Sequence, residues 1–194
     1  MKKAILILFL FSISYCQNFK SKPAEAVVLS TAVGTRIPTG TFGNEHALGY
    51  GFNMSLYYTQ SEIIPVLLFT RLGIEHYSGS QNYLKNNSKY SSINTTLFPI
   101  TLGIKYYYPP ILTDRLLILP FFETALIYAY TSKVYTHRQQ FIRDVSQYNN
   151  NFGLNLSAGL SSVLFDFTAF YNYIPNNQHF GFDIRVNIPI YTRF

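Results

Sequence analysis

The segment FGLNLSAGLS, residues 152–161, decides the fold class. Apolar side chains occupy every second position, and glycine, serine or asparagine fills the positions between them. A period of two is typical of a β-strand with one apolar and one polar face, whereas a helix repeats its apolar residues every three to four positions. The same alternation recurs in four other segments, residues 50–59, 66–75, 98–106 and 184–194.

Extending this pattern along the chain predicts eight strands, near residues 24–37, 49–59, 65–78, 95–108, 115–132, 151–162, 164–174 and 180–194. Each is long enough for a tilted membrane strand, which needs about 9–11 residues. The connections alternate between short ones (60–64, 109–114 and near 163) and longer ones (38–48, 79–94, 133–150 and 175–179). No segment shows a helical stripe, so we expect no amphipathic helix after the N-terminal segment.

The composition excludes several classes of protein. Of the 194 residues, 48% are hydrophobic and only 12% are charged, against about 25% charged in ordinary soluble domains. This balance excludes disorder, and a single cysteine excludes a disulfide scaffold. The net charge of +6 comes without a basic stripe or recognition helix, so we expect no nucleic-acid partner.

The N-terminus has the pattern of a secretory signal peptide. Lys2 and Lys3 precede an apolar run of about ten residues, which is too short to span a bilayer as a helix. Small residues before Gln17 suit a cleavage site, which gives a signal peptide over residues 1–16 and one domain over residues 17–194. Acylation of Cys16 is the alternative, although the bulky Tyr15 before it is unusual for a lipoprotein signal.

The two faces of the strands distinguish a membrane barrel from a soluble sandwich. The apolar face carries large side chains, with tyrosines near the strand ends as an aromatic girdle would need. The other face carries small polar residues and equal numbers of bases and acids: Arg36, Arg71, Lys105, Arg185, Glu75, Glu123, Asp166 and Asp183. Charges inside a barrel must be paired, so these eight residues predict a luminal ion network. We therefore predict an all-β, eight-stranded, antiparallel up-and-down transmembrane β-barrel.

Some positions within the predicted strands disagree with this pattern. Pro99, Pro120 and Pro189 remove ladder hydrogen bonds, so we expect them at bulges or edges. In the fifth strand three apolar residues, Leu117, Leu119 and Phe121, share the parity of Glu123. Either they plug one end of the lumen or a bulge near Pro120 switches the parity.

The chain ends at Phe194 after the alternating Ile188 and Ile190, which resembles the assembly signal of bacterial outer-membrane proteins. The segment GTRIPTGTFG, residues 34–43, resembles the first strand and loop of the small outer-membrane β-barrel domain family. These are eight-stranded relatives of the OmpX and OmpA barrels, often labelled as porin family. The resemblance covers nearly the whole mature chain. It implies the fold, insertion by the barrel-assembly machinery and a place among outer-membrane lipids in a Gram-negative cell envelope, but no particular activity.

The chemistry of the residues offers one catalytic candidate. His76 and Ser78 share the lipid-facing parity, and the triplet HYS is similar to the motif of lipid A deacylase barrels. Gly79 follows the serine where that family has asparagine, and no carboxylate follows until Asp114. The four histidines are isolated and fall near predicted extracellular ends, so we expect solvated residues and no metal or cofactor site.

We therefore expect a non-enzymatic outer-membrane barrel with a lumen filled by side chains. Its role would be surface interaction, envelope integrity or membership of an outer-membrane complex. The segments 79–94 and 133–150, rich in Tyr, Asn and Ser, are the predicted contact loops for a protein or glycan. A deacylase that uses His76 and Ser78, or a narrow ion channel, are the alternatives.

Overall fold

The structure is a computed structural model that describes residues 25–60, 66–86, 89–113, 116–138, 144–162 and 164–193. The predicted signal peptide, Cys16 and Phe194 lie outside these residues, as do residues 139–143 of one predicted loop. No helix among the described residues is long and apolar enough to cross a membrane.

The chain forms strands joined by turns and two short helices. The strands are β1 (Glu25–Pro38), β2 (Gly49–Gln60), β3 (Val66–Ser78), β4 (Tyr90–Tyr107), β5 (Ile111–Thr113), β6 (Leu116–His137), β7 (Val145–Ser162), β8 (Phe165–Tyr173) and β9 (His179–Arg193). The helices are α2 (Gly40–Glu45) and α3 (Gln81–Asn86).

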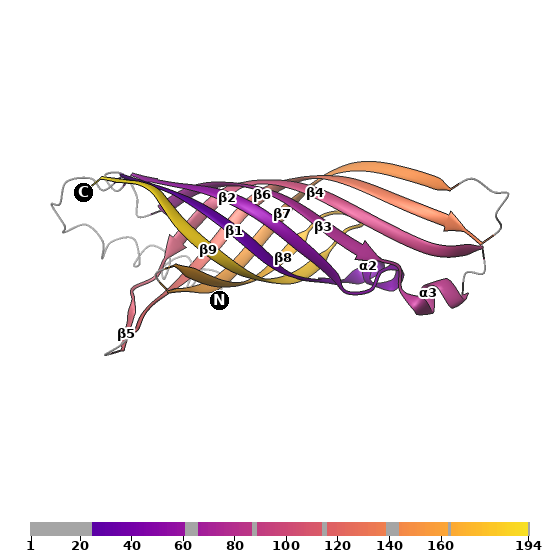
Figure 1. The fold of residues 1–194 in the computed structure, drawn as a ribbon, viewed down its shortest axis with the longest axis horizontal. Helices are drawn as coiled ribbons and strands as arrows, with labels where there is room; N and C mark the ends of the chain where they lie inside the picture. The colour runs from indigo at the N-terminus through magenta and orange to yellow at the C-terminus, as the bar shows by residue number, and fades with distance from the viewer. Residues whose placement is uncertain are drawn as a thin grey trace, which may run out of the picture.

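Eight of these strands close into a ring. Each pairs antiparallel with its neighbour in the chain, β4 pairs with β6, and β9 returns to pair with β1. Residues 25 and 193 pair at one end of the ring, which we call the inner end, and α2 and α3 lie at the opposite, outer end (Figure 1). The predicted eight-stranded up-and-down barrel is confirmed.

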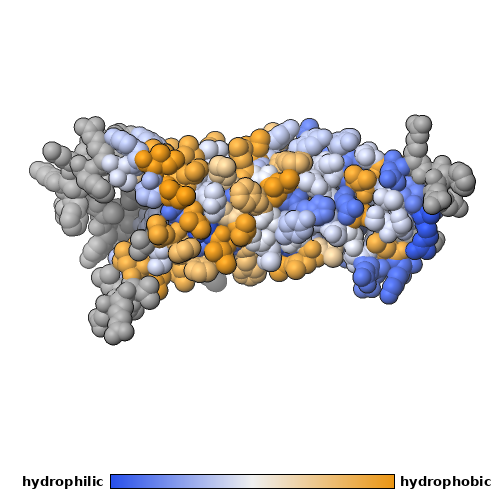
Figure 2. Space-filling view, viewed as in Figure 1, coloured by the Kyte–Doolittle hydropathy of each residue, from blue (hydrophilic) through white to orange (hydrophobic). Residues whose placement is uncertain are grey.

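Alternation along the strands sorts side chains between lipid and lumen. Leu102, Leu126 and Leu154 turn outward and expose more than half of their surface, whereas Glu123 and Asp166 turn inward and expose none. Figure 2 shows hydrophobic side chains gathered over the half of the surface nearer β5 and hydrophilic ones at the end that carries α3. An apolar outer band around a polar interior is the pattern of a transmembrane barrel.

Three predicted details were wrong. The predicted loops included residues 90–94, 133–137 and 145–150, but these residues continue β4, β6 and β7, because a strand above the membrane no longer needs an apolar face. The turn 109–114 contains β5, which forms a short hairpin with β6. Two helices of six residues also occur, which are too short to produce a helical stripe in the sequence.

The prolines and the fifth predicted strand find a simple explanation. Pro189 lies beside the register shift between β1 and β9, whereas Pro99 and Pro120 keep the register of their pairs. Since β6 has no bulge at Pro120, Phe121 stays on the inward face and is 2% exposed, which is the plug alternative. Leu117 lies beyond the ring, opposite Leu112 in the hairpin.

Candidate functional site

Glu123 on β6 is the centre of the larger group of luminal charges. Arg185 donates to both oxygens of its carboxylate, at 2.6 and 3.1 Å, and Arg71 donates to Oε2 at 2.8 Å. The hydroxyl of Tyr57 accepts hydrogen bonds from both arginines and donates to Glu123 at 3.2 Å. Strands β2, β3, β6 and β9 thus meet at one buried carboxylate, and we call this group the Glu123 cluster.

Lys105 and Asp166 extend the Glu123 cluster toward the inner end. The Lys105 ammonium lies 2.6 Å from Asp166 Oδ2 and 3.9 Å from Glu123 Oε1. It also lies 3.9 Å from the centre of the Phe121 ring, and Asn187 donates to the other oxygen of Asp166. An aromatic face attracts a desolvated cation, so Phe121 stabilises Lys105 while it fills the lumen.

A second group of charges, the Arg36 cluster, lies nearer the outer end. Arg36 donates to Glu75 Oε1 at 2.8 Å and to Asp183 Oδ1 at 2.6 Å. Asn53 donates to the second oxygen of Asp183, and Tyr77 donates to Glu75 Oε2 at 2.9 Å. The guanidinium lies over the Phe170 ring, 4.6 Å from its centre. Each carboxylate in this cluster therefore has two different donors.

All eight predicted charged residues are buried and take part in ion pairs within one of the two clusters. The Glu123 cluster holds three cations and two anions, and the Arg36 cluster holds one cation and two anions. The net charges of the two clusters, +1 and −1, therefore cancel across the lumen. Between the clusters lies a cavity of about 20 Å³ lined by Arg36, Arg71 and Asn53, which has room for about one water molecule.

His179 belongs to the Arg36 cluster, although the sequence analysis did not select it. Its Nε2 lies 3.2 Å from Glu75 Oε2 and 2.8 Å from Asn172 Nδ2, and its side chain is fully buried. The expectation of solvated histidines was therefore wrong for His179, because β9 begins inside the lumen. His179 shares the inward parity of Asp183 and Arg185, and that parity was a usable signal.

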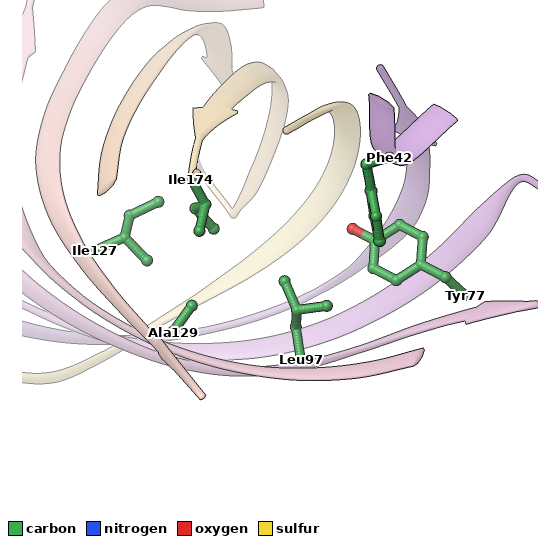
Figure 3. Packing of buried hydrophobic residues seen from close by; sticks show 6 residues of the cluster. All are labelled: Phe42, Tyr77, Leu97, Ile127, Ala129 and Ile174. Carbon is green, nitrogen blue, oxygen red and sulfur yellow. The ribbon is translucent and has the colours of Figure 1, made fainter. Parts of the chain in front are cut away.

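An apolar cluster closes the lumen above the Arg36 cluster. Helix α2 inserts Phe42 between the strands, and its ring lies edge-on to Tyr77 with 4.9 Å between the ring centres (Figure 3). Leu97, Ile127, Ala129 and Ile174 complete the cluster. Outside it, Glu45 at the end of α2 forms an ion pair with Lys133 of β6. The outer mouth is thus covered by a helix and sealed by apolar side chains.

His46 fastens α2 to the barrel. It is buried, so the expectation of a solvated residue was wrong here too, since α2 folds back into the mouth. Its Nε2 lies 2.7 Å from Thr95 Oγ1, and its Nδ1 lies 3.2 Å from the Phe42 carbonyl. Burial and the nearby charge of Lys133 lower the pKa of His46 to about 4, while the Phe42 carbonyl opposes the shift.

We expect acid to loosen α2. The unfolded histidine binds its proton near pH 6.5 but the folded one only near pH 4, so the stabilisation is complete above pH 6.5 and is lost as the pH falls toward 4. Protection factors of the α2 amides in hydrogen exchange should fall by at least about tenfold between pH 7.5 and pH 4.5. His46→Gln, which does not titrate, should flatten this response. An equal fall in that variant would assign the loss to other groups.

The catalytic candidates His76 and Ser78 lie on the outward face of β3. The His76 ring packs against Tyr50, and its Nδ1 lies 3.3 Å from Thr96 Oγ1. Ser78 is exposed and pairs across the ladder with Asn94. The neighbouring carboxylate, Glu75, points into the lumen and is held by Arg36. The structure thus gives the His–Ser pair an outward position and turns the acid that precedes His76 in the chain away from it.

Two residues of the predicted assembly signal lie within the described part of β9. Ile188 and Ile190 turn outward at the inner end of β9. Within the described ranges, no group of three His, Cys, Asp or Glu residues could hold a metal ion.

Comparison with known proteins gives a likeness in shape. No family model and no curated protein matches the chain. Neisserial surface protein A matches at 17% identity and a TM-score of 0.48, over 82% of this chain and 95% of that one. The chain resembles small bacterial outer-membrane β-barrels.

Two further solved structures illustrate the likeness. Ail, the attachment invasion locus protein of Yersinia pestis, matches at 12% identity and a TM-score of 0.43, over 87% of this chain and 100% of that one. The N-terminal β-barrel domain of Pseudomonas aeruginosa OprF matches at 14% identity and a TM-score of 0.40, over 85% of this chain and 99% of that one.

Proposed function

We propose that this protein is an outer-membrane barrel that acts without catalysis, through the exposed part of β7 at its outer end. That end would face the outside of the cell, and the inner end the periplasm. The observation that carries the proposal is the free edge of β7. Strand β6 pairs with β7 from Val145 onward, but β8 pairs with it only from Leu154 onward.

The free edge has the properties of a contact surface for polypeptide. Residues 144–150 are all exposed, and residues 145–151 contain neither charge nor proline, two features that usually block pairing at a sheet edge. On one face of this extension, the rings of Tyr148 and Tyr130 stack with 6.0 Å between their centres. An extended segment of a partner protein could add to this edge through its backbone, with the tyrosines selecting its side chains.

The filled lumen supports this role over a narrow ion channel. Phe42 and Tyr77 close the outer end, and Phe121 lies beside Lys105 toward the inner end. Between them the charges are paired, and the 20 Å³ cavity is far too small for a continuous water path.

The position of Glu75 weighs against the deacylase alternative. A serine nucleophile needs a histidine base, which in turn needs a group that orients it. On β3 the adjacent carboxylate, Glu75, points into the lumen and accepts a hydrogen bond from Arg36, and the His76 Nδ1 contacts Thr96.

The proposal includes export and insertion of the chain. Cleavage after residue 16 would release it into the periplasm, and the last strand, with Ile188, Ile190 and Phe194, would engage the barrel-assembly machinery. Tyr58 at the inner end and Tyr50 and Tyr173 at the outer end are exposed at strand ends, and we propose that they belong to an aromatic girdle at the two membrane surfaces.

Positive charges on the free edge of β7 should weaken the binding of partner proteins. Ser146→Lys combined with Asn149→Lys places two charges on the edge, opposite the uncharged Val134 and Thr131 of β6, and disfavours the addition of a further strand. Cells that display this variant should bind an array of immobilised serum and matrix proteins at least about tenfold less than cells with the native protein.

The matched control is Gln81→Lys with Asn82→Lys, which adds the same charge to exposed residues of α3. It should bind as the native protein does. Equal losses in the two variants would show a general charge effect and contradict a role for the β7 edge.

A further inference from the structure

His76 has an unusual place on the lipid-facing surface. Between the terminal residues of the described strands, it is the one outward-facing side chain of Asp, Glu, Lys, Arg or His type. Its ladder partner is Tyr50, which we place in the girdle at the outer membrane surface, so the imidazole lies at the level of the lipid headgroups. The fold gives His76 no stabilising role in the lumen, because its side chain points away from both charge clusters.

A groove lies beside this histidine on the outer face of β1, β2 and β3. It has a volume of about 410 Å³, and its apolar walls are Val33, Phe52 and Ile74. Its floor includes Gly34 and Gly51, which are partners in the β1–β2 ladder. A shallow apolar channel on the membrane face has the shape and polarity for an acyl chain.

Polar groups meet at the outer end of the groove. Tyr50, His76 and Thr96 lie in one ladder row across β2, β3 and β4 and all line the groove. Each of these three side chains can donate a hydrogen bond. Three donors on one row suit an acceptor-rich anion such as a phosphate.

We propose that the groove binds a phosphate-bearing lipid of the leaflet at the outer end. Its acyl chain lies on Val33, Phe52 and Ile74, and its phosphate accepts hydrogen bonds from His76 and Tyr50. The occupant is a lipid because the groove opens on the face that the barrel turns to the membrane. The site depends on the barrel alone, so it does not require the contact surface proposed for β7.

The test uses the full mature chain, folded in phosphate-free maltoside micelles. Diphosphorylated lipid A is the probe, and a diacylglycerol of similar chain length is the control without phosphate. Native mass spectrometry measures the lipid retained, and the imidazole NMR signals of His76 report contact at the site. The native protein should retain lipid A in preference to the diacylglycerol, with shifted His76 signals.

His76→Leu keeps the outward face apolar and should lower lipid A retention by about tenfold, the effect of one charge-assisted hydrogen bond. Ser78→Ala, on the same outward face of β3 but outside the groove, should retain lipid A as the native protein does. A band-shift gel verifies that both variants fold. Equal retention of lipid A by His76→Leu and the native protein, or equal retention of the two lipids by the native protein, would overturn the proposal.

Discussion

Replacing Glu123 with alanine should lower the free energy of unfolding by about 3–5 kcal/mol. The change leaves Arg71 and Arg185 without their shared carboxylate and leaves Lys105 with Asp166 alone. Removing one member of a buried ion group is costly because the remaining charges have no water to solvate them. Urea-induced unfolding from lipid vesicles, followed by the band shift on gels, measures the difference.

Two comparison variants make this result specific. Asp144→Ala removes an acid at an exposed position and should change the stability by less than about 0.5 kcal/mol. Glu123→Ala combined with Arg71→Met removes a cation together with the anion and should recover part of the loss, since the two residues are coupled. If Glu123→Ala were as stable as Asp144→Ala, the lumen would be hydrated and the pairing unimportant.

The sequence predicts the ring and its two faces because alternation is a local property. In β7, each outward residue is followed by an inward one, so FGLNLSAGLS already separates lipid from lumen. The same alternation also assigns two residues to the lumen that we did not select from the sequence. Tyr77 shares the inward parity of Arg71 and Glu75, and both Tyr77 and His179 lie within reach of that carboxylate.

The partners within the network were beyond sequence reasoning. Arg36 pairs with Glu75 and Asp183, and the second partner is 147 positions away in the chain. Such a pair depends on the register in which β9 returns to β1, and no local pattern fixes that register. The prediction of a loop at residues 145–150 was wrong for a different reason. These residues of β7 stand above the membrane and are exposed on both faces, so they lack the alternation that identifies a strand.

Gly34→Ala should be the most damaging small substitution on the inward face of β1. An added Cβ would lie 1.8 Å from the Phe182 carbonyl oxygen and 2.3 Å from Asp183 Oδ1, so the backbone of β9 would have to move. Overpacking of this kind costs about 3 kcal/mol or more when backbone must shift. The matched control is Gly73→Ala on β3, whose Cβ would meet Pro99 Cγ at 3.1 Å and should cost about 1 kcal/mol.

The larger effect at Gly34 follows from where that residue sits. Strands β1 and β9 are far apart in the chain, and their pairing closes the ring. A ring that opens at this seam exposes unpaired backbone groups to lipid, which a membrane strand does not tolerate. Refolding into vesicles should therefore yield less folded protein for Gly34→Ala than for Gly73→Ala. Equal yields and equal urea midpoints would show that the seam between β1 and β9 can widen without loss.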